Sequence, residues 1–233
     1  MYFILRTLVI KLKVVVSGGH IVSSSVSCQY AIYNEGIQYW NVFKPVLDEF
    51  ENRQIQIHYL TSVQNDPAFE ADYHFVKSEF IGEGNKAIAR LNLFSADILL
   101  MTTPGLDVYQ LKRSKSVKHY AHILHMPSDA TMYRLFGIDY FDSVLLTGEY
   151  QAKDIKTLEA LRSLPQKKLV TVGCTYLDVA NDKIKTVVPE EEHPFTVLIS
   201  PSWGPSSLLC KYGDKLLDPL VKSGWRIIVR PHP

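Results

Sequence analysis

Short apolar runs alternate with amphipathic helical stretches along this chain, and this alternation constrains its fold more than any other feature. The expected strands are residues 29–33, 55–60, 73–80, 97–101, 117–124, 143–146 and 168–172. Helices are expected at residues 37–52 and 85–94, the second with Asn85 as its N-cap. Strands separated by helices at this interval are typical of a doubly wound, mostly parallel α/β sheet, so we expect a Rossmann-like domain.

A change of composition divides the sequence into two expected domains. Residues 186–194 place two prolines around a short acidic run, which is typical of a linker. After this linker, a strand at residues 195–199, a helix at residues 206–222 and a strand at residues 225–229 form one βαβ unit. Parallel strands need cover on both faces. The sequence therefore predicts a first domain over residues 1–188 and an incomplete second domain over residues 189–233.

Net charge and cysteine spacing exclude several classes of function. The formal net charge is +1, and no basic stripe is interleaved with the aromatic residues, so no nucleic-acid partner is expected. Cys28, Cys174 and Cys210 are far apart and form no CxxC pair, which argues against a zinc knuckle and a disulfide framework. A reducing, cytoplasmic environment is the simplest interpretation.

The first sixteen residues, MYFILRTLVIKLKVVV, are apolar but interrupted by Arg6, Lys11 and Lys13. These cations break any apolar run long enough to span a bilayer, and they also disrupt the apolar region of a signal peptide. Three interpretations stay open: an irregular start, a cover for the sheet, or a contact with the membrane surface.

Three histidines at the end of one expected strand are candidates for chemistry. His119, His122 and His125 lie three residues apart, a spacing that suggests a metal site on a helix. On a strand, His119 and His125 face one side and His122 the other, which argues against a three-ligand cluster. The alternatives are hydrogen-bonded packing histidines, or a general base at His125, because imidazole titrates near neutrality. No metal or other cofactor is expected.

Two turns in the second domain are candidates for binding phosphate. The first is SPSWGPSS, residues 200–207, where Ser206 is a candidate N-cap and free backbone N–H groups favour phosphate oxygens. An ordinary strand-to-helix turn explains the same residues equally well. The second turn contains Arg230 and His232, which offer donors for phosphate between two prolines. The glycines around Glu83 are a weaker signal, because two glycines are common in loops.

Taken in order, these segments resemble the CDP-glycerol glycerophosphotransferase family, the teichoic-acid primases and polymerases. The segments that carry the resemblance are YNEGIQYWNVFKPVLDEF, HILHMPSD, FDSVLLTGEYQAKDI, VGCTYLD, PSWG and IIVRPHP, and they extend from about Cys28 to Pro233. Together and in this order they are fairly specific, whereas none is specific alone.

The resemblance implies two facing Rossmann-like domains in the GT-B arrangement, with the acceptor on the first and the CDP-linked donor on the second. His125 corresponds to the family's histidine that deprotonates the acceptor hydroxyl. On the donor side, His232 corresponds to a His-Pro motif, and Ser202, Trp203 and Gly204 to a Pro-Ser/Thr-Trp turn. Met126 departs from the pattern, because family members usually have glycine there.

The function expected from the resemblance is transfer of glycerol phosphate from CDP-glycerol to a lipid-linked or polyol-phosphate acceptor. His125 would act as the base, while Arg230, His232 and the helix start at Ser206 stabilise the pyrophosphate. Little activity is expected from an incomplete donor domain. Two alternatives stay open: a glycosyltransferase that uses sugar nucleotides, and a non-catalytic acceptor-binding or scaffolding protein at the inner face of the membrane.

Overall fold

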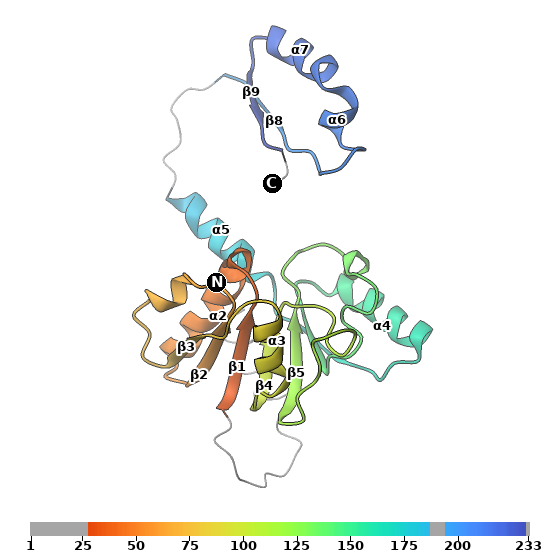
Figure 1. The fold of residues 1–233 in the computed structure, drawn as a ribbon. Coiled ribbons are helices and arrows are strands. Elements are labelled where there is room, and N and C mark those ends of the chain that lie inside the picture. The colour runs from red at the N-terminus through yellow and green to blue at the C-terminus, as the bar shows by residue number, and fades with distance from the viewer. Residues whose placement is uncertain (1–27, 187–193, 232–233) are drawn as a thin grey trace. The chain divides into compact units, whose positions relative to one another are not determined.

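The structure is a computed structural model that describes residues 28–186 and 194–231 (Figure 1). The expectations for residues 1–16 and for His232 lie outside these ranges. The chain divides into two units, Met1–Ile184 and Lys185–Pro233, whereas the sequence predicted a boundary between residues 188 and 189.

The first unit is built on a seven-stranded sheet in which every pair of neighbouring strands is parallel. The strands are β1 (Cys28–Asn34), β2 (Ile57–Thr61), β3 (Val76–Phe80), β4 (Ala96–Met101), β5 (Val117–Ile123), β6 (Ser143–Leu146) and β7 (Lys168–Thr171). Their order is β3-β2-β1-β4-β5-β6-β7. The prediction of an α/β chain with a mostly parallel, Rossmann-like sheet is confirmed.

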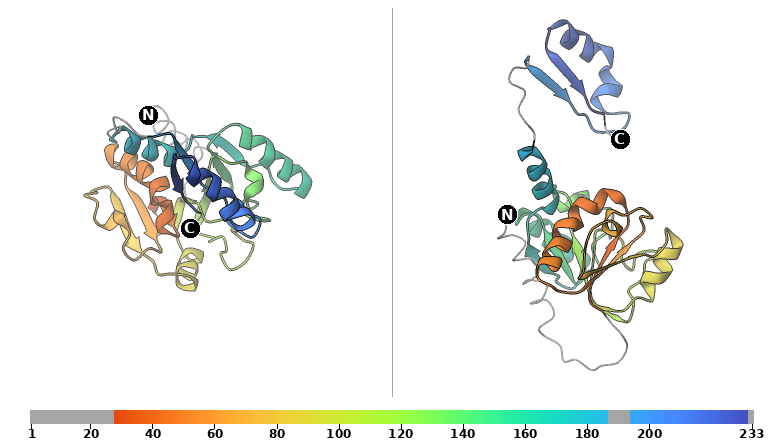
Figure 2. Two further views of the ribbon diagram at one scale, coloured as in Figure 1. Left: turned by 90° about the horizontal axis from the view of Figure 1, so that it is seen from above. Right: turned by 90° about the vertical axis from the view of Figure 1, so that its left-hand side faces the viewer.

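Helices cover both faces of this sheet (Figure 2). The helices of the unit are α2 (Trp40–Asn52), α3 (Asn85–Asn92), α4 (Tyr150–Arg162) and α5 (Thr175–Lys185), with single 3-10 turns η1 (Ile37–Tyr39), η2 (Pro67–Phe69) and η3 (Ala130–Met132). Side chains alternate between the faces along each strand. In β1, Ile32 therefore packs with α2, while Ala31 and Tyr33 pack with α3.

The largest apolar cluster lies between α2 and the sheet. Phe43, Leu47 and Phe50 of α2 are almost completely buried and share this cluster with Tyr59 of β2. Burial of one such side chain stabilises the folded state by about 1.5–3 kcal/mol. The helical spacing that predicted α2 is thus the spacing of its buried face.

A buried polar cluster joins the ends of β1 and β2 to η2. One carboxylate oxygen of Asp66 accepts hydrogen bonds from Asn34 at 3.0 Å, Tyr59 at 3.0 Å and Thr61 at 2.6 Å. Its other oxygen accepts from the backbone N–H of Ala68 at 3.0 Å, which caps η2. These four donors compensate for burying a carboxylate in the core.

One helix start in the first unit differs from its prediction. The N-cap of α3 is Gly84, with φ of 54°, and Asn85 is the first helical residue. A left-handed φ favours glycine, because a Cβ at that position meets the neighbouring carbonyl. The prediction of Asn85 as the cap was therefore wrong by one residue.

The second unit is a βαβ arrangement with two parallel strands, β8 (Thr196–Ile199) and β9 (Arg226–Val229). The predicted single helix is divided at Gly213 into α6 (Leu208–Tyr212) and α7 (Asp214–Lys222), because Gly213 adopts φ of 44°. Ser207 caps α6: its side chain accepts from the N–H of Cys210 at 3.3 Å. The prediction of Ser206 as the cap was wrong.

No helix within residues 28–186 and 194–231 has the length and apolar character needed to cross a lipid bilayer.

Candidate functional site

A cavity of about 590 Å³ lies at the carboxyl edge of the seven-stranded sheet. Its lining includes residues that follow four strands: Glu35 after β1, Ser62 after β2, Thr102 after β4 and His125 after β5. The chain continues from β1 toward one end of the sheet and from β4 toward the other. In open α/β sheets, ligands bind at such a switch point. This cavity is therefore the candidate functional site.

His125 lies just beyond β5, where it is half-buried in the wall of the cavity. Its ring meets the ring of Tyr39 edge-on, with 4.9 Å between the centroids. Burial lowers the pKa of His125 below its ordinary value of 6.5, because the charged form loses solvation. The imidazole is thus neutral at physiological pH and has a lone pair available to accept a proton.

Tyr133 connects His125 to a second imidazole. The hydroxyl oxygen of Tyr133 is 3.5 Å from Nδ1 of His125 and 3.0 Å from Nε2 of His122. His122 is completely buried, and burial lowers its pKa to about 3. Because β5 ends at Ile123, strand alternation no longer separates His122 from His125, and one hydroxyl reaches both. The sequence analysis placed His122 and His125 on opposite sides of a strand, but both imidazoles contact the same hydroxyl of Tyr133.

A carboxylate and a guanidinium also line the cavity. Burial raises the pKa of Glu35, while the Thr103 hydroxyl and the charge of Arg134 act in the opposite direction. Burial raises the pKa of Tyr39, and the charge of Glu35 raises it further. Glu35 is therefore a half-buried carboxyl group that interacts electrostatically with Arg134 and Tyr39 in the lining of the cavity.

A buried hydroxyl in the cavity wall has no hydrogen-bond partner within the described part of the chain. The side chain of Thr102 is fully buried, and its Oγ1 has no hydrogen-bond partner there. Leaving a buried hydroxyl unpaired costs about 1–3 kcal/mol. By contrast, the hydroxyls of Tyr33 and Ser62, also in the lining, bond to each other at 2.9 Å. Thr102 is thus one of the polar groups of this site that a ligand would satisfy.

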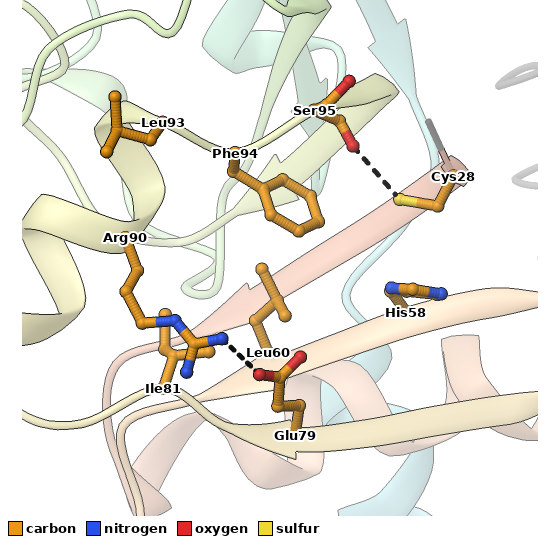
Figure 3. A pocket seen from close by; sticks show the side chains of 9 residues that line it. All are labelled: Cys28, His58, Leu60, Glu79, Ile81, Arg90, Leu93, Phe94 and Ser95. Carbon is orange, nitrogen blue, oxygen red and sulfur yellow. Dashed lines mark hydrogen bonds and ion pairs between the residues drawn. The ribbon is translucent and has the colours of Figure 1, made fainter. Parts of the chain in front are cut away.

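A smaller pocket of about 380 Å³ is lined from β1, β2, β3 and α3 (Figure 3). Glu79 and Arg90 form an ion pair across it, and the thiol of Cys28 donates to the carbonyl of Ser95 at 3.5 Å. Burial raises the pKa of Cys28 to about 11, so this thiol remains protonated and is a poor nucleophile. Glu79 and Arg90 thus neutralise each other within the pocket.

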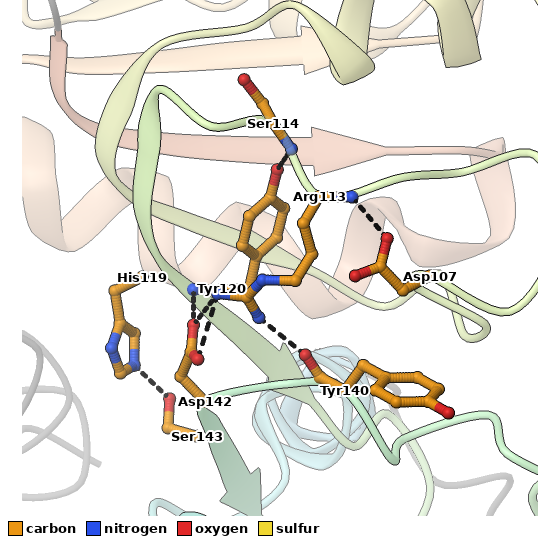
Figure 4. Close-up of polar contacts among 8 residues, drawn as sticks. All are labelled: Asp107, Arg113, Ser114, His119, Tyr120, Tyr140, Asp142 and Ser143. Carbon is orange, nitrogen blue, oxygen red and sulfur yellow. Dashed lines mark hydrogen bonds and ion pairs between the residues drawn. The ribbon is translucent and has the colours of Figure 1, made fainter.

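The third histidine belongs to a separate polar network (Figure 4). Nε2 of His119 is 2.9 Å from the hydroxyl of Ser143, next to Asp142, which binds the guanidinium of Arg113 at 3.1 and 2.8 Å. His119 is therefore a packing histidine. Across the described ranges, no three His, Cys, Asp or Glu side chains form a group that could hold a metal ion.

In the second unit, two of the predicted binding segments lie at the same edge. The N–H of Arg230 donates to the carbonyl of Ile199 at 2.8 Å, so Arg230 continues the pairing of β9 with β8. Ser202, Trp203, Gly204 and Ser206 occupy the connection that leaves β8 at this edge. Trp203, Ser206 and Arg230 are exposed. The role of these residues in phosphate binding stays a prediction.

The sequence identified His125 but missed the residues that accompany it in the cavity. Glu35, Thr102, Tyr133 and Arg134 were not recognised as site residues. Glu35 and Thr102 each follow a strand directly, so the rule that ligands bind at carboxyl ends of strands would have found them. Tyr133 and Arg134 follow η3 in a long connection between β5 and β6, and only the folded chain brings them to His125.

No family model matches the sequence, and comparisons with curated proteins and with solved structures give no significant match.

Proposed function

We propose that this chain is a GT-B-type transferase that moves glycerol phosphate from CDP-glycerol to a hydroxyl of a lipid-linked or polyol-phosphate acceptor. The acceptor hydroxyl binds in the cavity of the first unit. The second unit binds the pyrophosphate of the donor. The observation that carries the proposal is the position of His125: a half-buried imidazole in a cavity at the switch point of a parallel sheet.

The proton balance of the reaction requires a base of this kind. The acceptor oxygen attacks the β-phosphorus of CDP-glycerol, a new P–O bond forms, and the bond from that phosphorus to the oxygen bridging to CMP breaks. CMP leaves with the bonding electron pair, and the acceptor proton passes to His125. A base whose pKa lies somewhat below physiological pH is unprotonated and ready for this step, and general bases of this type contribute about 10²–10⁴-fold to a rate.

The donor side of the proposal depends on Arg230, an exposed cation of the second unit. Arg230 offers five N–H donors in a planar fork that matches phosphate oxygens. It lies at the same edge as the turn at Ser202, Trp203 and Gly204, where φ of Gly204 is 99°. Charge on the leaving CMP would be stabilised there. His232 is the second expected donor.

The test is a turnover assay on the full-length protein with CDP-glycerol and a glycerol phosphate oligomer, with release of CMP as the readout. His125→Ala should lower the rate by at least about 10²-fold. His119→Gln is the matched control, because this histidine lies on β5, shortly before His125, but is not in the lining of the cavity. Equal rates for wild type and His125→Ala would remove the base assignment.

A panel of CDP-alcohols and UDP-sugars distinguishes the competing functions. Release of UDP with a sugar acceptor, and not of CMP, would identify a glycosyltransferase of the same two-domain design. Acceptor binding without turnover of any donor would identify a non-catalytic acceptor-binding protein. Either result would replace the proposal.

A further inference from the structure

The cavity at His125 carries a second inference, which concerns what part of an acceptor it holds and which rests on the proposed function. We propose that this cavity binds one uncharged polyhydroxyl unit, a sugar ring or a terminal polyol, through Glu35 and Thr102, and that it excludes phosphate groups. The phosphate groups of an acceptor would then lie outside it.

The charges of the lining argue against an anionic ligand. The lining contains two carboxylates, Glu35 and Glu83, and one guanidinium, that of Arg134. His125 adds no positive charge near neutral pH, because burial lowers its pKa. Glu35 is half-buried, so its field is less screened by solvent than that of an exposed carboxylate. A phosphate group entering the cavity would be repelled by this carboxylate and would lose its own hydration.

The polar groups of the lining suit hydroxyls. The Oγ1 of Thr102 is fully buried and has no partner within the described residues, so it can both donate to and accept from a ligand. The carboxylate of Glu35 accepts only, and the guanidinium of Arg134 donates only. A hydroxyl both donates and accepts, so adjacent hydroxyls on one ligand can satisfy all three groups.

The rest of the lining fits the carbon skeleton of such a ligand. Tyr39, Tyr109 and Tyr133 provide aromatic surfaces, and Ile88 and Leu111 provide aliphatic ones. Sites for small molecules typically combine apolar and aromatic walls with a few converging polar groups, in volumes of about 300–1,000 Å³. The volume of about 590 Å³ lies within this range.

The experiment compares matched neutral and phosphorylated probes on the whole chain, in the absence of any nucleotide donor. Glucose is paired with glucose 6-phosphate, and glycerol with glycerol 3-phosphate. Dissociation constants are measured from the backbone amide shifts of Thr102 and Thr103 in the isotope-labelled protein. Each neutral probe should bind more tightly than its phosphorylated partner, by at least about tenfold, which corresponds to 1.4 kcal/mol.

Two substitutions test the named residues. Thr102→Val keeps the shape of the side chain and removes the hydroxyl, so it should weaken binding of glucose about tenfold. It should leave the melting temperature unchanged or raise it, because it removes a buried hydroxyl that has no partner within residues 28–186 and 194–231. Glu35→Gln should weaken glucose binding and reduce the preference over glucose 6-phosphate, because the repelling charge is gone.

Thr61→Val is the matched control, because it removes the same atom from a threonine that is already paired. Thr61 Oγ1 donates to Asp66 at 2.6 Å and accepts from the N–H of Val63 at 3.0 Å. This variant should lower the melting temperature and leave the dissociation constant for glucose unchanged. A purely structural role for Thr102 would give it the same pattern as Thr61.

Three outcomes would overturn the inference: equal or tighter binding of the phosphorylated probes, an unchanged dissociation constant in Thr102→Val, or no saturable shift with glucose or glycerol. Failure of the proposed function looks different. Neutral probes would bind with the expected preference, but no donor would be consumed in the turnover assay.

Discussion

The hydroxyl oxygen of Tyr133 lies between two imidazoles, 3.0 Å from Nε2 of His122 and 3.5 Å from Nδ1 of His125. Nδ1 of His122 is buried and has no partner within the described residues. A buried lone pair without a partner is less costly than a buried N–H without one. This favours the tautomer in which Nε2 of His122 donates to Tyr133, so that the hydroxyl of Tyr133 points its own proton at Nδ1 of His125. Neutral His125 then carries its proton on Nε2, and Nδ1 takes the proton of an acceptor hydroxyl that displaces the long 3.5 Å contact with Tyr133.

Replacing Tyr133 by Phe should raise the pKa of His125 toward its ordinary value of 6.5. The hydroxyl of Tyr133 donates to neutral imidazole but not to imidazolium, so its removal weakens the preference for the neutral form. Phenylalanine fills nearly the same volume, so the burial that lowers the pKa is retained. The measurement is an NMR titration of the Cε1–H resonance of His125.

Tyr39→Phe is the control for this titration. Tyr39 meets His125 through its ring, with 4.9 Å between the centroids, and this contact survives loss of the hydroxyl. The pKa of His125 should therefore be the same in Tyr39→Phe as in the wild type. An identical titration in Tyr133→Phe would show that the hydroxyl has no influence on the base.

His122 makes the stability of the protein depend on pH in a defined window. Burial lowers its pKa from 6.5 to about 3, so the unfolded chain binds a proton at a higher pH than the folded chain does. The contribution of His122 to the free energy of unfolding is therefore complete above pH 6.5, and it is lost as the pH falls from 6.5 toward 3. In the wild type this residue alone should remove about 1 kcal/mol between about pH 7.5 and pH 5.5.

The variant His122→Gln isolates this contribution. The substitution itself lowers the free energy of unfolding at about pH 7.5, and this lowered value is the reference for the variant. Between about pH 7.5 and about pH 5.5, the free energy of unfolding of the variant should fall by about 1 kcal/mol less than that of the wild type. Urea unfolding at the two pH values gives both free energies. If wild type and variant lose the same amount, His122 is not kept neutral by burial.

The carboxylate of Asp66 should be among the most costly polar groups to replace. Asn34, Tyr59 and Thr61 all donate to one of its oxygens. In Asp66→Asn the charge is lost and the amide cannot accept from all the donors, so we expect a loss of about 3 kcal/mol in the free energy of unfolding. Asp72→Asn, at an exposed position, should change it by less than about 0.5 kcal/mol. Similar losses in both variants would contradict the role of the cluster.

Most of the fold was predictable because its signal is local. The strand at residues 143–146 and the helical face of Phe43, Leu47 and Phe50 follow from apolar spacing, which reports burial directly. Helix ends were less predictable. The start of α3 and the break at Gly213 depend on left-handed glycines, and a glycine in a sequence does not reveal its φ.

The candidate site was only partly predictable, because its members converge from distant positions. His125 was identifiable as a histidine at a strand exit. Tyr133 and Arg134 lie in an irregular connection, so neither periodicity nor spacing relates them to His125. The hydroxyl of Thr102 is significant only because the folded chain leaves it buried without a partner among the described residues, which no sequence pattern expresses.

Arg113 should not tolerate replacement by lysine, because its contacts depend on a planar fork (Figure 4). One NH group binds both oxygens of Asp142 at 3.1 and 2.8 Å, another donates to the carbonyl of Tyr140 at 2.7 Å, and the guanidinium lies 4.7 Å from the ring centre of Tyr120. Lysine keeps the charge but cannot make these contacts together. We expect Arg113→Lys to lower the free energy of unfolding by about 1–2 kcal/mol, measured by urea unfolding.

The matched control for this variant is Arg90→Lys. Arg90 pairs with Glu79 at a more exposed position, with 54% and 38% of the two side chains accessible, compared with 29% and 34% for Arg113 and Asp142. Exposed pairs contribute little, so this variant should lose less than about 0.5 kcal/mol. If the two substitutions cost the same, charge alone explains the contribution of Arg113. A larger loss at Arg113 would instead show that the fork joins the connection before β5 to the start of β6.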